Sequence, residues 1–316
     1  MAQNIIEYWR EQVVSDLFSM SSFNGLWTIW RPLITTAMTP MNGRKAYNAG
    51  DRLFEIFRAT GNAGRSQSDL SASGAAWEAL VCWYLNYNLI GRRTIVIKHK
   101  DEYVPQAVSD AITVKYGTTK SNTESDLIGI SFPEDPLFTD DKDDIQINNE
   151  DGERVRLYKT KRSKYNLKEV IDSLANRYFY SMEIHIIQCK TNWNDNAQIP
   201  MLWDMIYSAS GFTSSRIRVG QAARMIAYAK RFSYSFVTVP TVDTSPITPT
   251  SLQVLRVNNL SGGNYWGLPS KTGVADNVKE ILTRNLSAGH TDPLEMTFDN
   301  ELARTDFSSA YGYFML

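Results

Sequence analysis

The fold can be predicted by starting from MEIHIIQCK, at residues 182–190. It is apolar, contains three isoleucines, and is followed at once by the polar turn TNWNDNAQ at 191–198. A short run of β-branched residues that ends at turn residues predicts a strand. Two similar runs lie upstream, TIVIKHK at 94–100 and DLIGISF at 126–132, and Pro133 ends the second. Together the three runs predict the centre of a β-sheet.

Helical patterns flank these strands in the sequence. Amphipathic, aromatic-rich segments fill the first 60 residues, and the polar stretch GNAGRSQSDLSAS at 61–73 reads as a loop. Ser73 is placed to cap a helix from about Gly74 to Leu89, which Gly91 would close. Further helices are predicted at 166–178, 199–210 and 273–286. Because strands and helices interleave, we expect an α/β or α+β fold with a central mixed sheet flanked by helices and a helical N-terminal region.

The length of 316 residues fits one large domain. We divide it into a helical region at 1–73, a core at 74–210 and a C-terminal region at 211–316 that we assign to recognition and dimerisation. Within the core, residues 133–175 form a charged insertion. The content of 43% hydrophobic and 21% charged residues excludes a disordered chain.

Charge and cysteine content restrict the partners and the compartment. With 33 basic and 34 acidic residues the net charge is -1, so a polyanion would need local clusters of cations. Two cysteines, Cys82 and Cys189, lie in apolar runs and cannot build a disulfide framework. No apolar run is long enough to span a bilayer, and the N-terminus lacks a signal-peptide pattern. We therefore expect a cytoplasmic protein with no membrane partner.

Three places carry the residues of a candidate active site. Asp126 opens the strand at 126–132, Gln188 and Lys190 end the strand at 182–190, and Glu78 lies on the preceding helix. Alternate residues of a strand share a face, so Gln188 and Lys190 point the same way and Cys189 points the other way. Oxygen ligands that hold Mg²⁺, with a lysine beside the attacking water, are what phosphodiester hydrolysis requires.

This arrangement resembles the PD-(D/E)XK nuclease superfamily and, within it, the type II restriction endonucleases. The resemblance covers residues 74–210 and implies a restriction-endonuclease-like core. It also implies that Asp126, Gln188 and Glu78 bind Mg²⁺ and that Lys190 assists the water. The implied activity is site-specific, Mg²⁺-dependent cleavage of double-stranded DNA by a homodimer. The aromatic first 60 residues and the tail FSSAYGYFML are candidates for the dimer interface.

The sequence departs from the family pattern at two positions. Ser125 stands where the family name has proline, and Gln188 replaces an acidic residue. Because Gln188 carries no negative charge, the predicted metal site depends more strongly on the carboxylate of Glu78. Other interpretations of these residues stay open, since Glu78 can instead pair with Arg92 or Arg93, and Lys190 can be a surface lysine.

Local clusters of cations are candidates for DNA contacts. The insertion has nine acidic residues at 133–153, followed by seven basic residues at 154–168 that are interleaved with Tyr158 and Tyr165. Arg216 and Arg218 alternate along the extended-looking SSRIRVG at 214–220 and would share a face. The asparagine side chains of Asn192 and Asn194 follow the strand at 182–190. The candidate DNA-binding residues are Asn192, Asn194, Arg216, Arg218, Lys161, Arg162 and Lys164. Alternatively, the basic run is a solvated arm neutralised by the acidic stretch before it, and the asparagines only form a turn.

Other chemistries lack their motifs. The three histidines, His99, His185 and His290, have no zinc-ligand spacing, and the glycine-rich phosphate-binding and nucleophile-elbow motifs are missing. Glu183 and His185 alternate with the site residues, and we expect them on the solvent side of the strand or against the insertion. Two functions remain as alternatives: a structure-selective or repair nuclease with the same core, and a non-catalytic DNA-binding protein with a degenerate nuclease fold.

Overall fold

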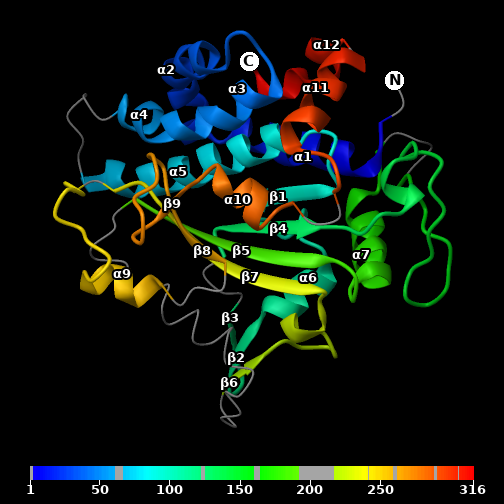
Figure 1. Ribbon diagram of the computed structural model, residues 1–316. Coiled ribbons are helices and arrows are strands. Elements are labelled where there is room, and N and C mark those ends of the chain that lie inside the picture. Colours follow the sequence, from blue (N-terminus) through cyan, green and yellow to red (C-terminus); the bar gives the residue numbers. More distant parts are fainter. Residues whose placement is uncertain are drawn as a thin grey trace.

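The computed structural model describes residues 3–60, 67–121, 125–159, 164–191, 217–240, 242–258, 262–287, 290–304 and 306–316. Figure 1 shows a sheet at the centre, with a thick layer of helices above it and further helices on its other side. The predicted α/β fold with a mixed sheet flanked by helices is therefore confirmed. None of the described helices is long and apolar enough to cross a membrane.

The main sheet has six strands in the order β1-β4-β5-β7-β8-β9. Their bounds are Thr94–Lys98 for β1, Leu127–Ser131 for β4, Glu183–Lys190 for β5, Arg231–Thr238 for β7, Gly263–Trp266 for β8 and Asp276–Asn277 for β9. The strands β1, β4 and β5 pair antiparallel, whereas β7, β8 and β9 continue from β5 in parallel. The three runs that predicted a sheet thus form three adjacent strands.

Burial on both faces explains why the central strands are so apolar. All residues of β4 are buried, and β5 is buried from Glu183 to Cys189. Strands covered on both sides lack the polar alternation of a half-exposed strand. The expectation that Glu183 and His185 face solvent is therefore wrong. His185 is fully buried and shares a hydrogen bond of 2.7 Å between its Nδ1 and Ser233 Oγ.

The helices above the sheet come from both ends of the chain (Figure 1). They are α1 (Ile5–Ser19), α2 (Ser21–Met38), α3 (Gly43–Asn48), η1 (Ala49–Arg52), α4 (Leu53–Arg58), α5 (Gln67–Asn88), α10 (Glu280–Arg284), α11 (Leu294–Arg304), α12 (Phe307–Tyr311) and η4 (Gly312–Phe314). The central helix, α5, is almost entirely buried from Ala76 to its end. It begins at Gln67, so the predicted loop over residues 67–73 is wrong. Packing on a buried face stabilises a helix beyond what its polar first turns predict.

Aromatic side chains hold this helical layer together. Trp27 and Trp83 pack with ring centroids 5.0 Å apart, and the Trp83 indole N–H donates to the carbonyl of Phe314. Phe314 is buried, as are Trp9 and Trp30. The prediction that the N-terminal segments and the C-terminal tail offer their aromatics to a dimer interface is wrong for these buried rings, because they form the chain's own core.

In Figure 1, α6 (Gln106–Ile112) lies below the strands, and α7 (Leu167–Tyr178) stands beside their right-hand end. A small second sheet, in the order β3-β2-β6, is formed by β2 (Val114–Tyr116), β3 (Thr119–Ser121) and β6 (Ile217–Val219). The remaining short helices are η2 (Pro136–Phe138), η3 (Ile226–Tyr228) and α9 (Leu252–Val257). The sequence did not predict the small sheet.

Candidate active site

The site is built where β4 begins and β5 ends. The two strands are antiparallel, with Leu127 opposite Ile187, and the same register sets Asp126 opposite Gln188. The Cys189 backbone N–H donates a hydrogen bond of 2.7 Å to Asp126 Oδ2, and Lys190 Nζ lies 3.9 Å from the same oxygen. Both side chains are 18% exposed. Asp126 and Lys190 are therefore adjacent, as the sequence predicted.

Glu78 is also near this point, but its partner is one that the sequence did not predict. Its carboxylate accepts a hydrogen bond from Lys98 Nζ at the end of β1. Pairing with Arg92 or Arg93 is not observed. Glu78 lies ten residues before the end of α5, which places it about 15 Å along the helix from the turn that leads to Arg92. In the sequence, Lys98 is simply the polar residue that ends the strand-like run at 94–98. That pattern does not predict its pairing with Glu78.

The electrostatics show that the two carboxylates influence one another. The pKa of Asp126 is raised to about 6, chiefly by burial and also by the negative charge of Glu78, while Lys190, the Cys189 N–H and Lys98 oppose the rise. Two like charges held in a half-buried place destabilise each other unless cations compensate them. Two ammonium groups, on Lys98 and Lys190, provide that compensation within the chain.

Gln188 is the most deeply buried of the four predicted site residues. It has no exposed surface, and its Oε1 accepts a hydrogen bond from the Tyr234 hydroxyl on β7. Its Nε2 and the Thr238 hydroxyl have no hydrogen-bond partner among the described residues. Gln188 thus lies opposite Asp126 in the strand register but is more deeply buried than Asp126 and Lys190. In the sequence, Tyr234 belongs to the strand pattern SYSFVTV, where a tyrosine is an ordinary core residue. The pattern therefore does not predict its hydrogen bond to Gln188.

Glu78, Asp126 and Gln188 fit the Mg²⁺ ion that the resemblance implies in the chemical type of their oxygen atoms. Glu78 and Asp126 supply carboxylate oxygens from two different elements, and their mutual repulsion is what a cation would relieve. The Gln188 carbonyl oxygen keeps a second lone pair beside its bond to Tyr234. In the parts of the chain that the structure describes, no three or more His, Cys, Asp or Glu residues are grouped as metal ligands would be. The fit therefore depends on two carboxylates and one amide.

The predicted DNA-binding residues are only partly described. Lys164 lies exposed in the insertion, and Arg218 is exposed on β6. Asn192, Asn194, Arg216, Lys161 and Arg162 lie outside the described residues. The aromatic residues interleaved with the basic run are held against the protein. Tyr165 is buried, with its ring 4.9 Å from that of Tyr8, and Tyr158 donates to Asp143.

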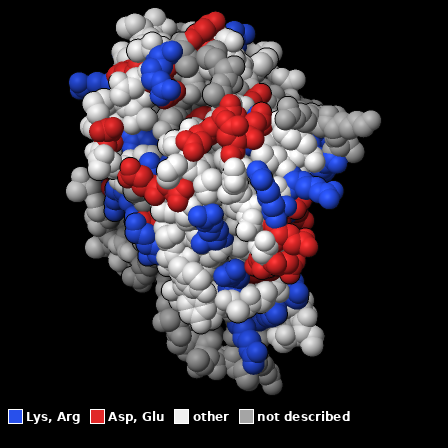
Figure 2. Space-filling view, turned by 90° about the vertical axis from the view of Figure 1, so that its right-hand side faces the viewer, with Lys and Arg blue, Asp and Glu red and all other residues white. Residues whose placement is uncertain are grey.

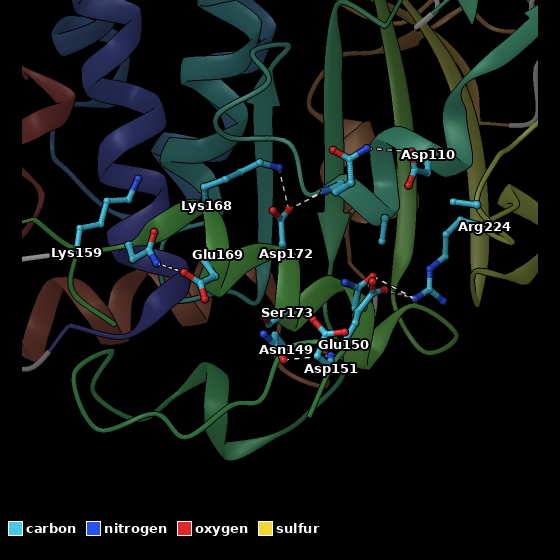
Figure 3. A pocket seen from close by; sticks show the side chains of 15 residues that line it. Asp110, Asn149, Glu150, Asp151, Lys159, Lys168, Glu169, Asp172, Ser173 and Arg224 are labelled. Atoms are coloured by element: carbon cyan, nitrogen blue, oxygen red, sulfur yellow. Dashed lines mark hydrogen bonds and ion pairs between the residues drawn. The ribbon is translucent and has the colours of Figure 1, made fainter. Parts of the chain in front are cut away.

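The pocket in Figure 3 lies elsewhere, between α6, α7 and the insertion. It has a volume of about 470 Å³, and none of the predicted site residues lines it. Its charged groups pair with one another, with Lys168 Nζ 2.8 Å from Asp172 and Arg224 3.2 Å from Glu150. Lys168 and Asp172 both belong to α7, whereas the pair of Arg224 with Glu150 links the segment after β6 to the insertion.

The sequence matches no model of a known protein family, and none of the curated proteins is significantly similar to it.

Proposed function

We propose that this chain is a Mg²⁺-dependent endonuclease that cleaves double-stranded DNA at specific sites, with a restriction-endonuclease-like core. One observation carries the proposal. Glu78, Asp126 and Lys190 come from three separate elements and converge at one end of the sheet. Helix α5 precedes the strands β1, β4 and β5, with α6, β2 and β3 between β1 and β4, and the helix predicted at 199–210 lies outside the described residues.

Each residue has a chemical role in this proposal. Glu78, Asp126 and Gln188 would hold Mg²⁺, which when bound polarises the phosphoryl oxygen and lowers the pKa of a water molecule. Lys190 orients the attacking water and stabilises the negative charge that develops at the phosphate. The Cys189 N–H fixes the Asp126 carboxylate, so the metal ligand and the lysine are positioned by the same strand.

Cleavage of both strands of a duplex requires two such sites, and the proposal therefore includes a homodimer related by a two-fold axis. The buried aromatic residues are excluded from its interface. Analytical ultracentrifugation of the protein with and without DNA measures the oligomeric state directly.

A second candidate function is favoured by the Glu78–Lys98 ion pair. An ammonium group already neutralises the carboxylate that would bind the metal, and Gln188 brings no charge of its own. A DNA-binding protein with a degenerate nuclease fold would retain this pairing permanently. It would bind DNA with the same affinity in Mg²⁺ and in EDTA.

The experiment that tests the proposal is incubation of unmethylated phage or plasmid DNA with the protein, in Mg²⁺ and in EDTA, followed by electrophoresis. We expect discrete fragments in Mg²⁺ and intact DNA in EDTA. A smear in Mg²⁺ would indicate a repair or structure-selective nuclease instead. Intact DNA under both conditions, with binding retained in a mobility-shift assay, would favour the degenerate DNA-binding protein.

A further inference from the structure

The small sheet carries three cations in one row. Lys115 is on the central strand β2, directly opposite Lys120 on β3 and directly opposite Arg218 on β6. Residues that face each other across antiparallel strands point to the same side of the sheet, and adjacent strands are about 4.8 Å apart. The three positive charges therefore start from backbone positions within about 10 Å of one another.

This row faces away from the core. The neighbouring residue on β2, Val114, is fully buried, and its partner Val219 packs against the core. Since successive side chains of a strand alternate between faces, Lys115 lies on the outer side. Lys120 and Arg218 are exposed. Figure 2 shows Lys and Arg atoms at the lower end of the molecule, the height at which Figure 1 places the small sheet, below the red atoms of that face.

No carboxylate in the described part of the chain forms an ion pair with these three side chains, although many other cations of the protein are paired. Like charges that lie directly opposite one another destabilise a sheet. Charged residues on outer strands can also serve to prevent edge-to-edge aggregation. That role does not account for Lys115, which is on the central strand and adds repulsion to both neighbours.

The row is tethered to the candidate active site. Only four residues lie between the end of β3 at Ser121 and Asp126, so their Cα atoms are at most about 18 Å apart. A polyanion that binds the row therefore passes within reach of the site. β-Sheets and ribbons with cationic side chains are known to contact duplex DNA.

We propose that Lys115, Lys120 and Arg218 form a phosphate-binding row that holds the DNA backbone beside the active site. This inference rests on the proposed function, because it names the surface that binds the substrate of that function. Each cation neutralises a backbone phosphate and releases a counterion, so the row contributes to affinity and to salt dependence without reading the sequence.

The test is duplex binding by fluorescence anisotropy in EDTA, where no metal-dependent cleavage occurs, over a series of salt concentrations. The variant combines Lys115→Ala, Lys120→Ala and Arg218→Ala. We expect its affinity at low salt to fall about 10- to 100-fold, and the slope of log K against log salt to decrease in magnitude by about 2 to 3. Its melting temperature should equal or exceed that of the wild type, because the repulsion is gone.

The matched control removes three exposed cations from the helical layer above the main sheet, by Arg31→Ala, Arg44→Ala and Lys45→Ala. It changes the net charge equally and should leave the salt slope unchanged. If the triple variant of the row fails to fold, Arg218→Ala alone should decrease the slope by about 1.

Three results would overturn the inference: an equal slope for the row variant and the wild type, no duplex binding by the wild type, or binding that depends on the row only for anionic lipid vesicles. The proposed function is judged separately, by cleavage in Mg²⁺. A protein that binds DNA through the row but does not cleave it would refute the nuclease and leave the row intact. A protein that cleaves DNA without using the row would support the nuclease and refute the phosphate-binding row.

Discussion

A backbone group orients the central carboxylate of the site. The Cys189 N–H donates to Asp126, and this donor belongs to the strand that also carries Lys190. The distance between the carboxylate and the lysine thus depends on the pairing of β4 with β5, which no single side chain controls. Such preorganised positions are what catalysis of phosphodiester cleavage requires.

Lys190→Ala tests the lysine's role at the level of the single residue. We expect cleavage to fall by about 100-fold or more, since removal of one group that stabilises transition-state charge costs roughly that factor. Duplex binding in EDTA should change little. Initial cleavage rates and anisotropy titrations measure the two effects.

Lys279→Ala is the matched control for that variant. Lys279 is 20% exposed and pairs with Asp51 at 2.8 Å, so it resembles Lys190 in burial and pairing but lies among residues of the helical layer. Its loss should reduce stability and leave the rate of cleavage unchanged. Equal rates for Lys190→Ala and Lys279→Ala would disprove the catalytic assignment of Lys190.

Lys98→Met tests whether Lys98 competes with the metal for Glu78. An ion pair at this level of burial contributes about 1 kcal/mol, so its removal should lower the Mg²⁺ concentration for half-maximal effect by about fivefold. The melting temperature as a function of Mg²⁺ concentration is a readout that does not need cleavage. Lys98→Arg retains the charge and should behave like the wild type. An unchanged Mg²⁺ midpoint in Lys98→Met would refute the competition.

At the scale of elements, a buried arginine joins α1, α5 and β1. Arg10 has no exposed surface, pairs with Glu7 at 3.0 Å, and donates to the carbonyls of Arg92 and Thr94 and to the Asn86 side chain. The carbonyls that it binds follow the end of α5 and lead into β1. Arg10 thereby fixes the turn between the helix that carries Glu78 and the strand that carries Lys98.

Arg10→Met should therefore destabilise the fold strongly. Removal of one partner of a buried ion pair leaves an uncompensated charge, here Glu7, and typically costs about 3–5 kcal/mol. Urea unfolding at neutral pH measures the loss. The double variant Glu7→Gln with Arg10→Met should recover part of it. A loss below about 1 kcal/mol in the single variant would contradict this role.

The C-terminal region shows how tertiary pairing overrides a local pattern. The sequence GVADNVKEILTRNL predicted a helix over 273–286, but the helix α10 comprises only Glu280–Arg284. Residues Asp276 and Asn277 pair instead with Tyr265 and Trp266 as the edge strand of the sheet. Backbone hydrogen bonding of Asp276 and Asn277 to β8 outweighed the helix propensity of this segment. No local feature of the sequence predicts that β8 is its partner.

At the scale of the whole molecule, buried histidine makes stability depend on pH. Burial lowers the pKa of His185 to about 3, with a further contribution from Arg231. In the unfolded chain the imidazole titrates near its ordinary value of about 6.5. Between these values the unfolded state binds a proton that the folded state does not. Stability therefore falls as the pH decreases from about 6.5 towards 3, by up to about 1.4 kcal/mol per pH unit.

His185→Gln should reduce this acid sensitivity. The variant loses some stability at pH 7 because the contact with Ser233 changes, but its unfolding free energy should fall less than that of the wild type between pH 7 and pH 5. Asp126 acts in the opposite sense, since its raised pKa lets the folded state take up a proton first, and it does so in both proteins. His99→Gln is the control. Parallel pH profiles for His185→Gln and the wild type would contradict the assignment.

Local sequence patterns predicted the sheet-forming runs, most of the helix before them, and the neighbouring positions of Asp126 and Lys190. Apolar strands and amphipathic helices are local patterns, and alternation along one strand fixes which side chains share a face. The sequence also predicted that the two cysteines build no disulfide framework, and both are buried and free. These features need no knowledge of which segments meet.

The side-chain partners of the candidate site residues depend on how distant segments pack together. Lys98 rather than an arginine pairs with Glu78, and Tyr234 binds Gln188. Glu183 and His185 are buried, and Phe314 of the C-terminal tail packs on Trp83 of α5. The row of Lys115, Lys120 and Arg218 spans about a hundred residues of sequence and exists only through the register of three short strands. Contacts between distant segments depend on how layers pack and strands pair, and that information is shared by the whole chain rather than held in any one stretch.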